Sequence, residues 1–204
     1  MWIIDDDSLY GNAYQEVIAQ FNHHFAIQYI KMEKNSGPGP CRNVVIAKGK
    51  APWITYIDDD DIVISNPLKQ FKTIDTNADL IKSIVTNGKG KECAQFNSFW
   101  TGCWGTIFNR NYLHTHNFQF FEPLGIIGTE DSVFTMLTTA CSDNIQHVDS
   151  FIVHQERNNS SYYLNSSSVI MHYGLSLLNL CNVCEALIRY KKYIKDFTIV
   201  WKVM

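Results

Sequence analysis

The sequence lacks several features that would assign it to a broad class at once. No apolar run approaches the about 20 residues that a membrane-spanning helix needs, and no secretory signal peptide opens the chain. The formal net charge of −3 excludes the broad basic surface of a typical nucleic-acid-binding protein. These absences lead us to expect a cytoplasmic globular protein.

The cysteines also lack an organised pattern. Six of them are spread irregularly over 204 residues, mostly inside apolar stretches, so we interpret them as reduced core residues. Cys181 and Cys184 form a Cys-x-x-Cys pair, but no second pair accompanies them, and core packing explains them better than zinc or redox chemistry. The length fits one domain with an appendage, and a hydrophobic fraction of 46% can supply its core.

Two short apolar runs each end in a cluster of acids. Residues 2–4 are followed by Asp5, Asp6 and Asp7, and residues 53–57 are followed by residues 58–61, all of which are aspartates. We name these clusters the first and second acidic segments. If the two runs are parallel strands of one sheet, both segments lie at the carboxyl edge, where open α/β sheets bind ligands.

The second acidic segment has the residues of a cation site. In extended backbone Asp58 and Asp60 share a face, while Asp59 points elsewhere. Two carboxylates this close repel each other, and oxygen ligands favour Mg²⁺, Mn²⁺ or Ca²⁺ over zinc. The alternative is a solvated acidic turn in which Asp61 caps the following element.

The remaining chain alternates between helical and extended patterns, which predicts an α/β fold. A mobile polar segment is expected at 158–168. We predict helices at 13–25, 42–48, 67–74, 129–140 and 168–195, and further strands at 26–30, 78–85 and 145–153.

Several residues stand out as candidates for binding or chemistry. Arg42 in the first turn of a helix opposes the helix dipole, which indicates that it faces an acid or a ligand. Glu130 and Asp131 suit the first turn of their helix, and either could be a general base if it faces the crevice. Trp104 could stack on a sugar or a base, or simply pack in the core.

These motifs, taken in order, resemble those of the family 2 glycosyltransferases of GT-A fold. The resemblance runs from Trp2 to about Ser161 and rests on the two acidic segments, Asn35 to Asn43, Trp104-Gly105, Gly128 to Asp131 and His154 to Arg157. It implies a Rossmann-like, mostly parallel sheet flanked by helices over residues 1–160, followed by a C-terminal helical tail at 161–204.

The resemblance also implies a function, the transfer of a sugar from a nucleotide-diphosphate sugar, usually with inversion. A UDP-sugar is the family's common donor, and a glycan or another hydroxyl compound is the acceptor. The implied roles are Mn²⁺ or Mg²⁺ binding by Asp58 and Asp60 (the DxD motif), nucleotide binding by Asp5, Asp6, Arg42 and Asp59, and general base catalysis by Asp131. Trp104, Glu130 and His154 are further site candidates near the acceptor or the diphosphate.

The family pattern normally begins one strand and one helix earlier than this sequence does. The absence of this first strand and helix exposes a sheet edge. The chain could form a homo-oligomer through this edge or through the C-terminal helix. The lysines near the C-terminus leave contact with a membrane surface as an alternative.

Two other functions fit parts of the sequence. A strand ending in Asp58-x-Asp60 also resembles the start of haloacid-dehalogenase-type phosphatases, although Ile62 is a poor match to their pattern. A catalytically degenerate GT-A-like module that only binds a nucleotide or a glycan is the other alternative. Release of nucleoside diphosphate from a sugar donor would separate the three.

Overall fold

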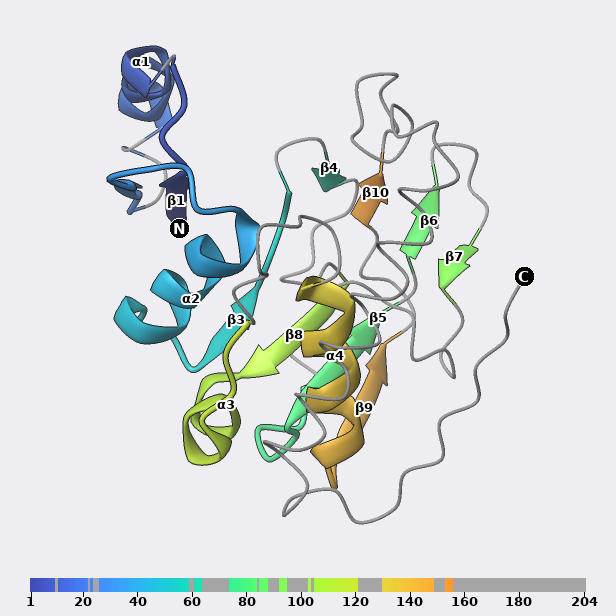
Figure 1. Cartoon of the computed structure of the whole chain (residues 1–204). Coiled ribbons are helices and arrows are strands. Elements are labelled where there is room, and N and C mark those ends of the chain that lie inside the picture. Colours follow the sequence, from blue (N-terminus) through green and yellow to red (C-terminus); the bar gives the residue numbers. More distant parts are fainter. Residues whose placement is uncertain are drawn as a thin grey trace, which may run out of the picture.

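The computed structural model describes residues 1–9, 11–21, 23, 26–58, 61–63, 74–83, 85–87, 92–94, 103, 105–120, 130–148 and 153–155. These residues contain both helices and strands, as the sequence predicts for an α/β fold (Figure 1). The predicted helices at 67–74 and 168–195 and the mobile segment at 158–168 lie wholly or almost wholly outside them. Within the described part of the chain, no helix is long and apolar enough to cross a membrane.

The N-terminal part is a β-α-β unit. Strand β1 (Trp2–Asp5) pairs in parallel with β2 (Gln28–Lys31), and helix α1 (Gly11–Phe21) connects them. The helix predicted at 13–25 and the strand predicted at 26–30 are therefore confirmed, with ends that differ by a few residues. Helix α2 (Pro38–Lys48) follows and starts four residues earlier than predicted, because proline is well suited to the first turn of a helix.

A four-stranded sheet forms the centre of the molecule. Its strand order is β3 (Trp53–Thr55), β8 (Thr106–Asn109), β5 (Leu80–Ser83) and β9 (Ile145–Val148). Strand β8 runs antiparallel to β3 and β5, whereas β9 is parallel to β5. The carboxyl ends of β3, β5 and β9 therefore lie at the same edge. The pairing is more mixed than the mostly parallel sheet of the prediction, because β8 returns between two strands of the opposite direction.

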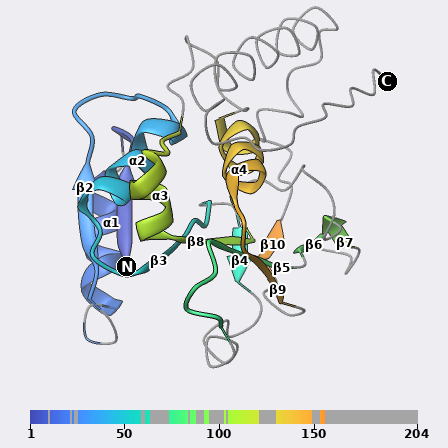
Figure 2. The same ribbon diagram turned by 90° about the horizontal axis from the view of Figure 1, so that it is seen from below.

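The hydrophobic core occupies both faces of this sheet. Leu80 and Phe108 pack on one face with Phe134 and Leu137 of helix α4 (Glu130–Cys141), which crosses that face (Figure 2). Ile81 belongs to a smaller cluster on the other face, as expected from the alternation of side chains along a strand. Helix α3 (Arg110–His116) continues directly from β8.

A further sheet has the order β4 (Asp61–Val63), β10 (Val153–Gln155), β6 (Val85–Asn87) and β7 (Glu92–Ala94). The predicted strand at 78–85 is thus divided between β5 and β6, and the one at 145–153 between β9 and β10. In both sheets the paired segments remain parallel. Each of these two predicted strands therefore begins in the central sheet and continues into this further sheet.

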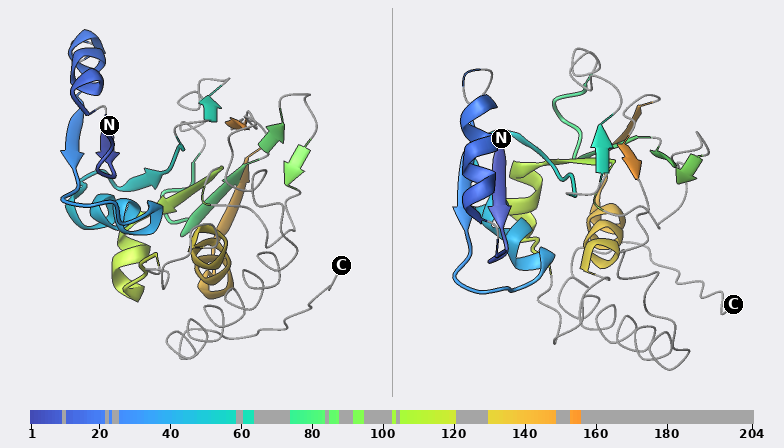
Figure 3. Two further views of the ribbon diagram at one scale, coloured as in Figure 1. Left: turned by 45° about the horizontal axis from the view of Figure 1, so that its top comes forward. Right: turned by 90° about the horizontal axis from the view of Figure 1, so that it is seen from above.

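The two acid-terminated strands are not in one sheet. Strand β1 pairs with β2, and β3 pairs with β8, in separate sheets of the described structure (Figure 3). Helix α2 connects the two parts, because it contacts both β1 and α4. The expectation of one shared sheet is wrong, since sheet order is set by long-range packing that a local pattern does not report.

Candidate active site

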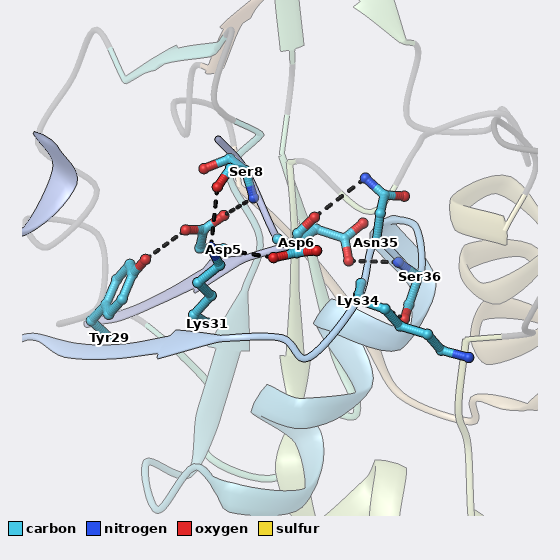
Figure 4. A network of polar contacts seen from close by, with 9 residues as sticks. Asp5, Asp6, Ser8, Tyr29, Lys31, Lys34, Asn35 and Ser36 are labelled. Atoms are coloured by element: carbon cyan, nitrogen blue, oxygen red, sulfur yellow. Dashed lines mark hydrogen bonds and ion pairs between the residues drawn. The ribbon is translucent and has the colours of Figure 1, made fainter. Parts of the chain in front are cut away.

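The first acidic segment is tied into the loops around it. Asp5 is buried and accepts hydrogen bonds from the Tyr29 hydroxyl at 2.5 Å and the Ser8 backbone N–H at 2.8 Å (Figure 4). Burial acts to raise the pKa of Asp5, but the hydrogen bonds from Tyr29 and Ser8 outweigh it and leave this pKa below its usual value. Asp5 is therefore held as a carboxylate.

Asp6 fixes the loop that enters α2. Its two carboxylate oxygens accept the backbone N–H groups of Ser36 and Gly37, each at 2.7 Å. Gly37 has φ of 84°, in the left-handed region that favours glycine, which explains this residue at this position. The Asp6 backbone oxygen also accepts the side-chain amide of Asn35 (Figure 4). The first acidic segment thus sets the start of α2.

Arg42 connects the second acidic segment to the first turn of α4. Its guanidinium donates to Asp58 Oδ1 at 2.6 Å and to Glu130 Oε1 at 2.7 Å. Arg42 and Glu130 are buried, whereas 37% of the Asp58 side chain is exposed. The prediction that Arg42 faces an acid is confirmed. Burial alone would lower the pKa of Arg42, but Cys103, Asp58 and Glu130 raise it above its usual value.

Phe120 forms one wall of the arginine site. The Arg42 guanidinium carbon lies 5.4 Å from the centre of the Phe120 ring, a cation–π distance. The side-chain amide of Asn43 accepts from the Phe120 N–H at 2.8 Å and donates to its carbonyl oxygen at 2.9 Å. Asn43 therefore fixes the backbone of Phe120, and the adjacent residue Arg42 packs against the face of the Phe120 ring.

The two acidic segments both meet the N-terminal half of α2. Cys41 is buried and its thiol interacts with Asp6, while the next residue, Arg42, binds Asp58. Burial, and then Asp6, raise the pKa of the Cys41 thiol to about 12, so it stays protonated. The predicted proximity of the two segments is thus achieved through α2 and not through a shared sheet.

Cys103 is a buried neighbour of this cluster that the sequence did not single out. It is fully buried, and its pKa is raised well above the usual value, first by burial and further by Asp131 and the other nearby acids. In the sequence it lies within an aromatic-rich run, which favours a core interpretation. Cys41, Cys103 and Cys141 are all buried free thiols, as predicted for reduced core cysteines.

Other predicted site residues are placed only partly or not at all. Asp131 is half-buried in the first turn of α4, beside Glu130. His154 lies on β10, where its backbone is paired with Ile62 and Thr86. Asp59, Asp60 and Trp104 lie outside the described residues.

The donor chemistry at Asp58 suits a hard divalent cation. Arg42 uses Oδ1 of this carboxylate, and its partial exposure leaves it accessible to solvent. Carboxylate oxygens are the ligands that Mg²⁺ and Mn²⁺ prefer. Among the described residues no group of three His, Cys, Asp or Glu side chains is arranged to hold a metal. Among the described residues, Asp58 is therefore the candidate metal ligand.

The chain is similar to known glycosyltransferases in both sequence and structure. Residues 1–121 match the family model described as glycosyl transferase family 2. The structure of S. aureus TarS 1–349 in complex with UDP-GlcNAc is 18% identical, with a TM-score of 0.68 over 94% of this chain and 63% of TarS 1–349. The complex of the same protein with UDP is 20% identical, with a TM-score of 0.66 over 94% and 62% of the two chains.

GalNAc-T7 with UDP, GalNAc and Mn²⁺ is 12% identical, with a TM-score of 0.64 over 92% of this chain and 41% of that one. No curated protein sequence matches. The chain spans less than two thirds of each of these solved structures. The likenesses confirm the predicted GT-A fold.

Proposed function

Because the chain belongs to glycosyl transferase family 2 and has the GT-A fold, we propose that it transfers a sugar from a nucleotide-diphosphate sugar to an acceptor hydroxyl. A UDP-sugar is the proposed donor, since UDP and UDP-GlcNAc are the ligands named for the TarS complexes. The reaction is proposed to proceed with inversion. The cytoplasm is the proposed location, in keeping with the buried free thiols.

The observation that carries the proposal is the arrangement around the start of α2. Asp6, Cys41, Arg42, Asp58 and Glu130 form one continuous set of contacts that joins both acidic segments to α4. A structural core rarely contains this many ionisable groups, whereas a site that binds a charged, polar ligand requires them. We assign nucleotide binding to Asp5, Asp6, Arg42 and Asp59.

Asp58 and Asp60 are the residues proposed to hold Mn²⁺ or Mg²⁺. A bound divalent cation would neutralise the negative charge that collects on the leaving nucleoside diphosphate. Mn²⁺ in the GalNAc-T7 structure supports this assignment by analogy. Arg42 orients Asp58 from the protein side, so that the carboxylate presents its accessible oxygen to the ligand.

Asp131 is the proposed general base. It would accept the proton of the acceptor hydroxyl as the new glycosidic bond forms. Glu130 is less suited to this role, because it is 4% exposed and its Oε1 already accepts from Arg42. Trp104 and His154 are proposed to contact the acceptor or the diphosphate.

Release of UDP from a UDP-sugar tests the proposal. The purified chain should release UDP in the presence of Mn²⁺ and lose this activity when EDTA removes the metal. We expect Asp131→Asn and Asp60→Ala each to lower the rate at least about 100-fold, as expected for loss of a general base or a metal ligand. Glu16→Gln, an exposed change on α1, serves as the matched control and should retain the wild-type rate.

Binding of UDP without any release would favour the degenerate binding module instead. One observation favours that second candidate: the Asp5 and Asp6 carboxylates already accept hydrogen bonds from groups of the protein itself. Family membership argues against the haloacid-dehalogenase-type phosphatase. Hydrolysis of a simple phosphate ester would reverse this judgement.

A further inference from the structure

Three polar side chains lie in one row across the central sheet, on the face that α4 covers. Lys82 of β5 is directly opposite Thr106 of β8. The pairing of Thr55 with Ile107, continued by one residue, places Tyr56 on the other side of Thr106. We name Lys82, Thr106 and Tyr56 the polar row. The preceding row on the same face is apolar and consists of Ile54, Phe108 and Leu80.

The polar row is buried but lacks internal partners. Lys82, Thr106 and Tyr56 are 5%, 0% and 7% exposed. Neither the Thr106 nor the Tyr56 hydroxyl has a hydrogen-bond partner in the described structure. The Lys82 side chain forms no hydrogen bond or ion pair with another described side chain, and burial by itself lowers its pKa to about 8. Three adjacent polar groups of this kind are costly to keep in a core.

The position of the row connects it to the proposed site. It is two residues closer than the apolar row to the edge where β3 and β5 end, and Asp58 follows Tyr56 by two residues at that edge. Lys82 is two strands from β3, about 10 Å at the usual strand spacing. An extended substrate that contacts Asp58 can span this distance, and Figure 1 shows β3, β8 and β5 side by side beneath α4.

We propose that Lys82, supported by the Thr106 and Tyr56 hydroxyls, binds a phosphoryl group of a substrate of this enzyme. The inference rests on the proposed sugar transfer and deepens it by naming the group bound next to the acid cluster. A phosphoryl oxygen supplies the negative charge and the hydrogen-bond acceptors that the row lacks. The phosphoryl group belongs either to the diphosphate of the donor or to a phosphorylated acceptor.

Calorimetric titration at pH 7 with Mn²⁺ tests the assignment on the whole chain. The ligands are UDP, uridine and inorganic phosphate, the last also in the presence of saturating UDP. The variants are Lys82→Met, Thr106→Val and Lys48→Met, where Lys48 is an exposed lysine of α2 and serves as the control. Methionine and valine keep the approximate volume of the replaced side chains, so packing is largely preserved.

For a donor diphosphate, Lys82→Met should weaken UDP binding about tenfold or more and leave uridine binding unchanged, because a charge-assisted hydrogen bond is lost. For an acceptor phosphate, UDP binding should be unchanged, and binding of inorganic phosphate beside UDP should weaken by a similar factor. Thr106→Val should show the same selectivity with a smaller loss. Lys48→Met should bind all three ligands as the wild type does.

A melting temperature measured without ligand separates a binding role from a structural one. Lys82→Met should melt at or above the wild-type temperature, because it removes a buried charge without a described partner. Unchanged affinity of Lys82→Met for UDP and for inorganic phosphate would overturn the inference, as would a lower melting temperature. If wild type itself binds no UDP, the proposed function fails, and loss of inorganic phosphate binding in Lys82→Met would still support the phosphoryl site.

Discussion

Arg42 is a buried cation shared by two carboxylates. Loss of its charge leaves Glu130, which is 4% exposed, without the partner that binds its Oε1. Removal of one member of a buried ion pair costs about 3–5 kcal/mol, and the part due to Asp58 is reduced by solvent because that side chain is 37% exposed. The cost should therefore lie near the lower end of this range.

We predict that Arg42→Met lowers the free energy of unfolding by about 3 kcal/mol. Chemical denaturation at pH 7 measures it, with the exposed Lys34→Met as the control. The double variant Arg42→Met with Glu130→Leu should recover much of the loss, because no buried charge then remains at this pair. A double variant less stable than Arg42→Met would contradict this explanation.

Lys82 gives the protein a distinct dependence of stability on pH. Its pKa is about 8 in the folded state and 10.5 in the unfolded chain, so the unfolded state binds more protons between these values. Stability conferred by this residue should therefore rise as the pH increases from about 8 to 10.5. Lys82→Met should lack the rise.

The measurement is the difference in unfolding free energy between wild type and Lys82→Met from pH 7 to 10.5. His147, opposite Lys82 on β9, does not interfere, because burial and the nearby Lys82 charge lower its pKa below 6.5. Thr106 does not ionise in this range, and burial raises the pKa of Cys103 and the pKa of Tyr56 well above their usual values. A constant difference across the range would show that Lys82 does not titrate as described.

Some of these residues could be predicted from the sequence and others could not. Arg42 was identified because it opposes the dipole of the helix predicted at 42–48, a conflict visible in the sequence alone; α2 itself starts at Pro38 and has Arg42 as its fifth residue. Lys82 is part of a segment whose sequence is that of an ordinary strand. Its burial without a charged partner depends on residues of β8 and β9, which lie beside it only in the folded structure. Long-range neighbours decide whether a lysine is buried.

At the scale of elements, α2 holds the site together through its N-terminal half. The Gly37 backbone precedes this helix with φ of 84° and donates its N–H to Asp6. An added Cβ would meet nothing within 4 Å, so substitution there is opposed by backbone conformation and not by space. Gly37 is therefore a position where conformational strain can be tested separately from steric clash.

We predict that Gly37→Ala lowers the free energy of unfolding by about 1–3 kcal/mol, the usual cost of a sparsely populated backbone conformation for a residue with a Cβ. Thermal or chemical denaturation measures the change. Ser36→Ala is the matched control, because it keeps the backbone N–H that Asp6 accepts and removes only a hydroxyl bonded to the exposed Lys34 carbonyl. Equal losses in the two variants would refute the conformational account.

The elements themselves were largely predictable, but their ends and partners were not. The helical spacing in 13–25 and the apolar run at 53–57 correspond to α1 and β3. The apolar patterns at 78–85 and 145–153 continue across the points where β5 gives way to β6 and β9 to β10. Hydrophobic periodicity records which face of a strand is buried, but it does not record which sheet buries it.

At the scale of the whole molecule, the GT-A fold and the family were predicted from the order of several weak motifs. That prediction succeeded because each motif imposes a local geometry. The motifs are the acids that follow short strands, the Gly-Pro loop and the acidic start of a helix. Their meeting point could not be predicted correctly, because it depends on how α2 packs against β1 and α4.

Helix α2 binds one acidic segment through Cys41 and the other through the very next residue. Successive residues of a helix point about 100° apart, so turning α2 by a single position would carry both side chains away from their partners in the same movement. The two acidic segments are therefore mechanically linked through α2, and neither can be displaced alone while this helix keeps its orientation.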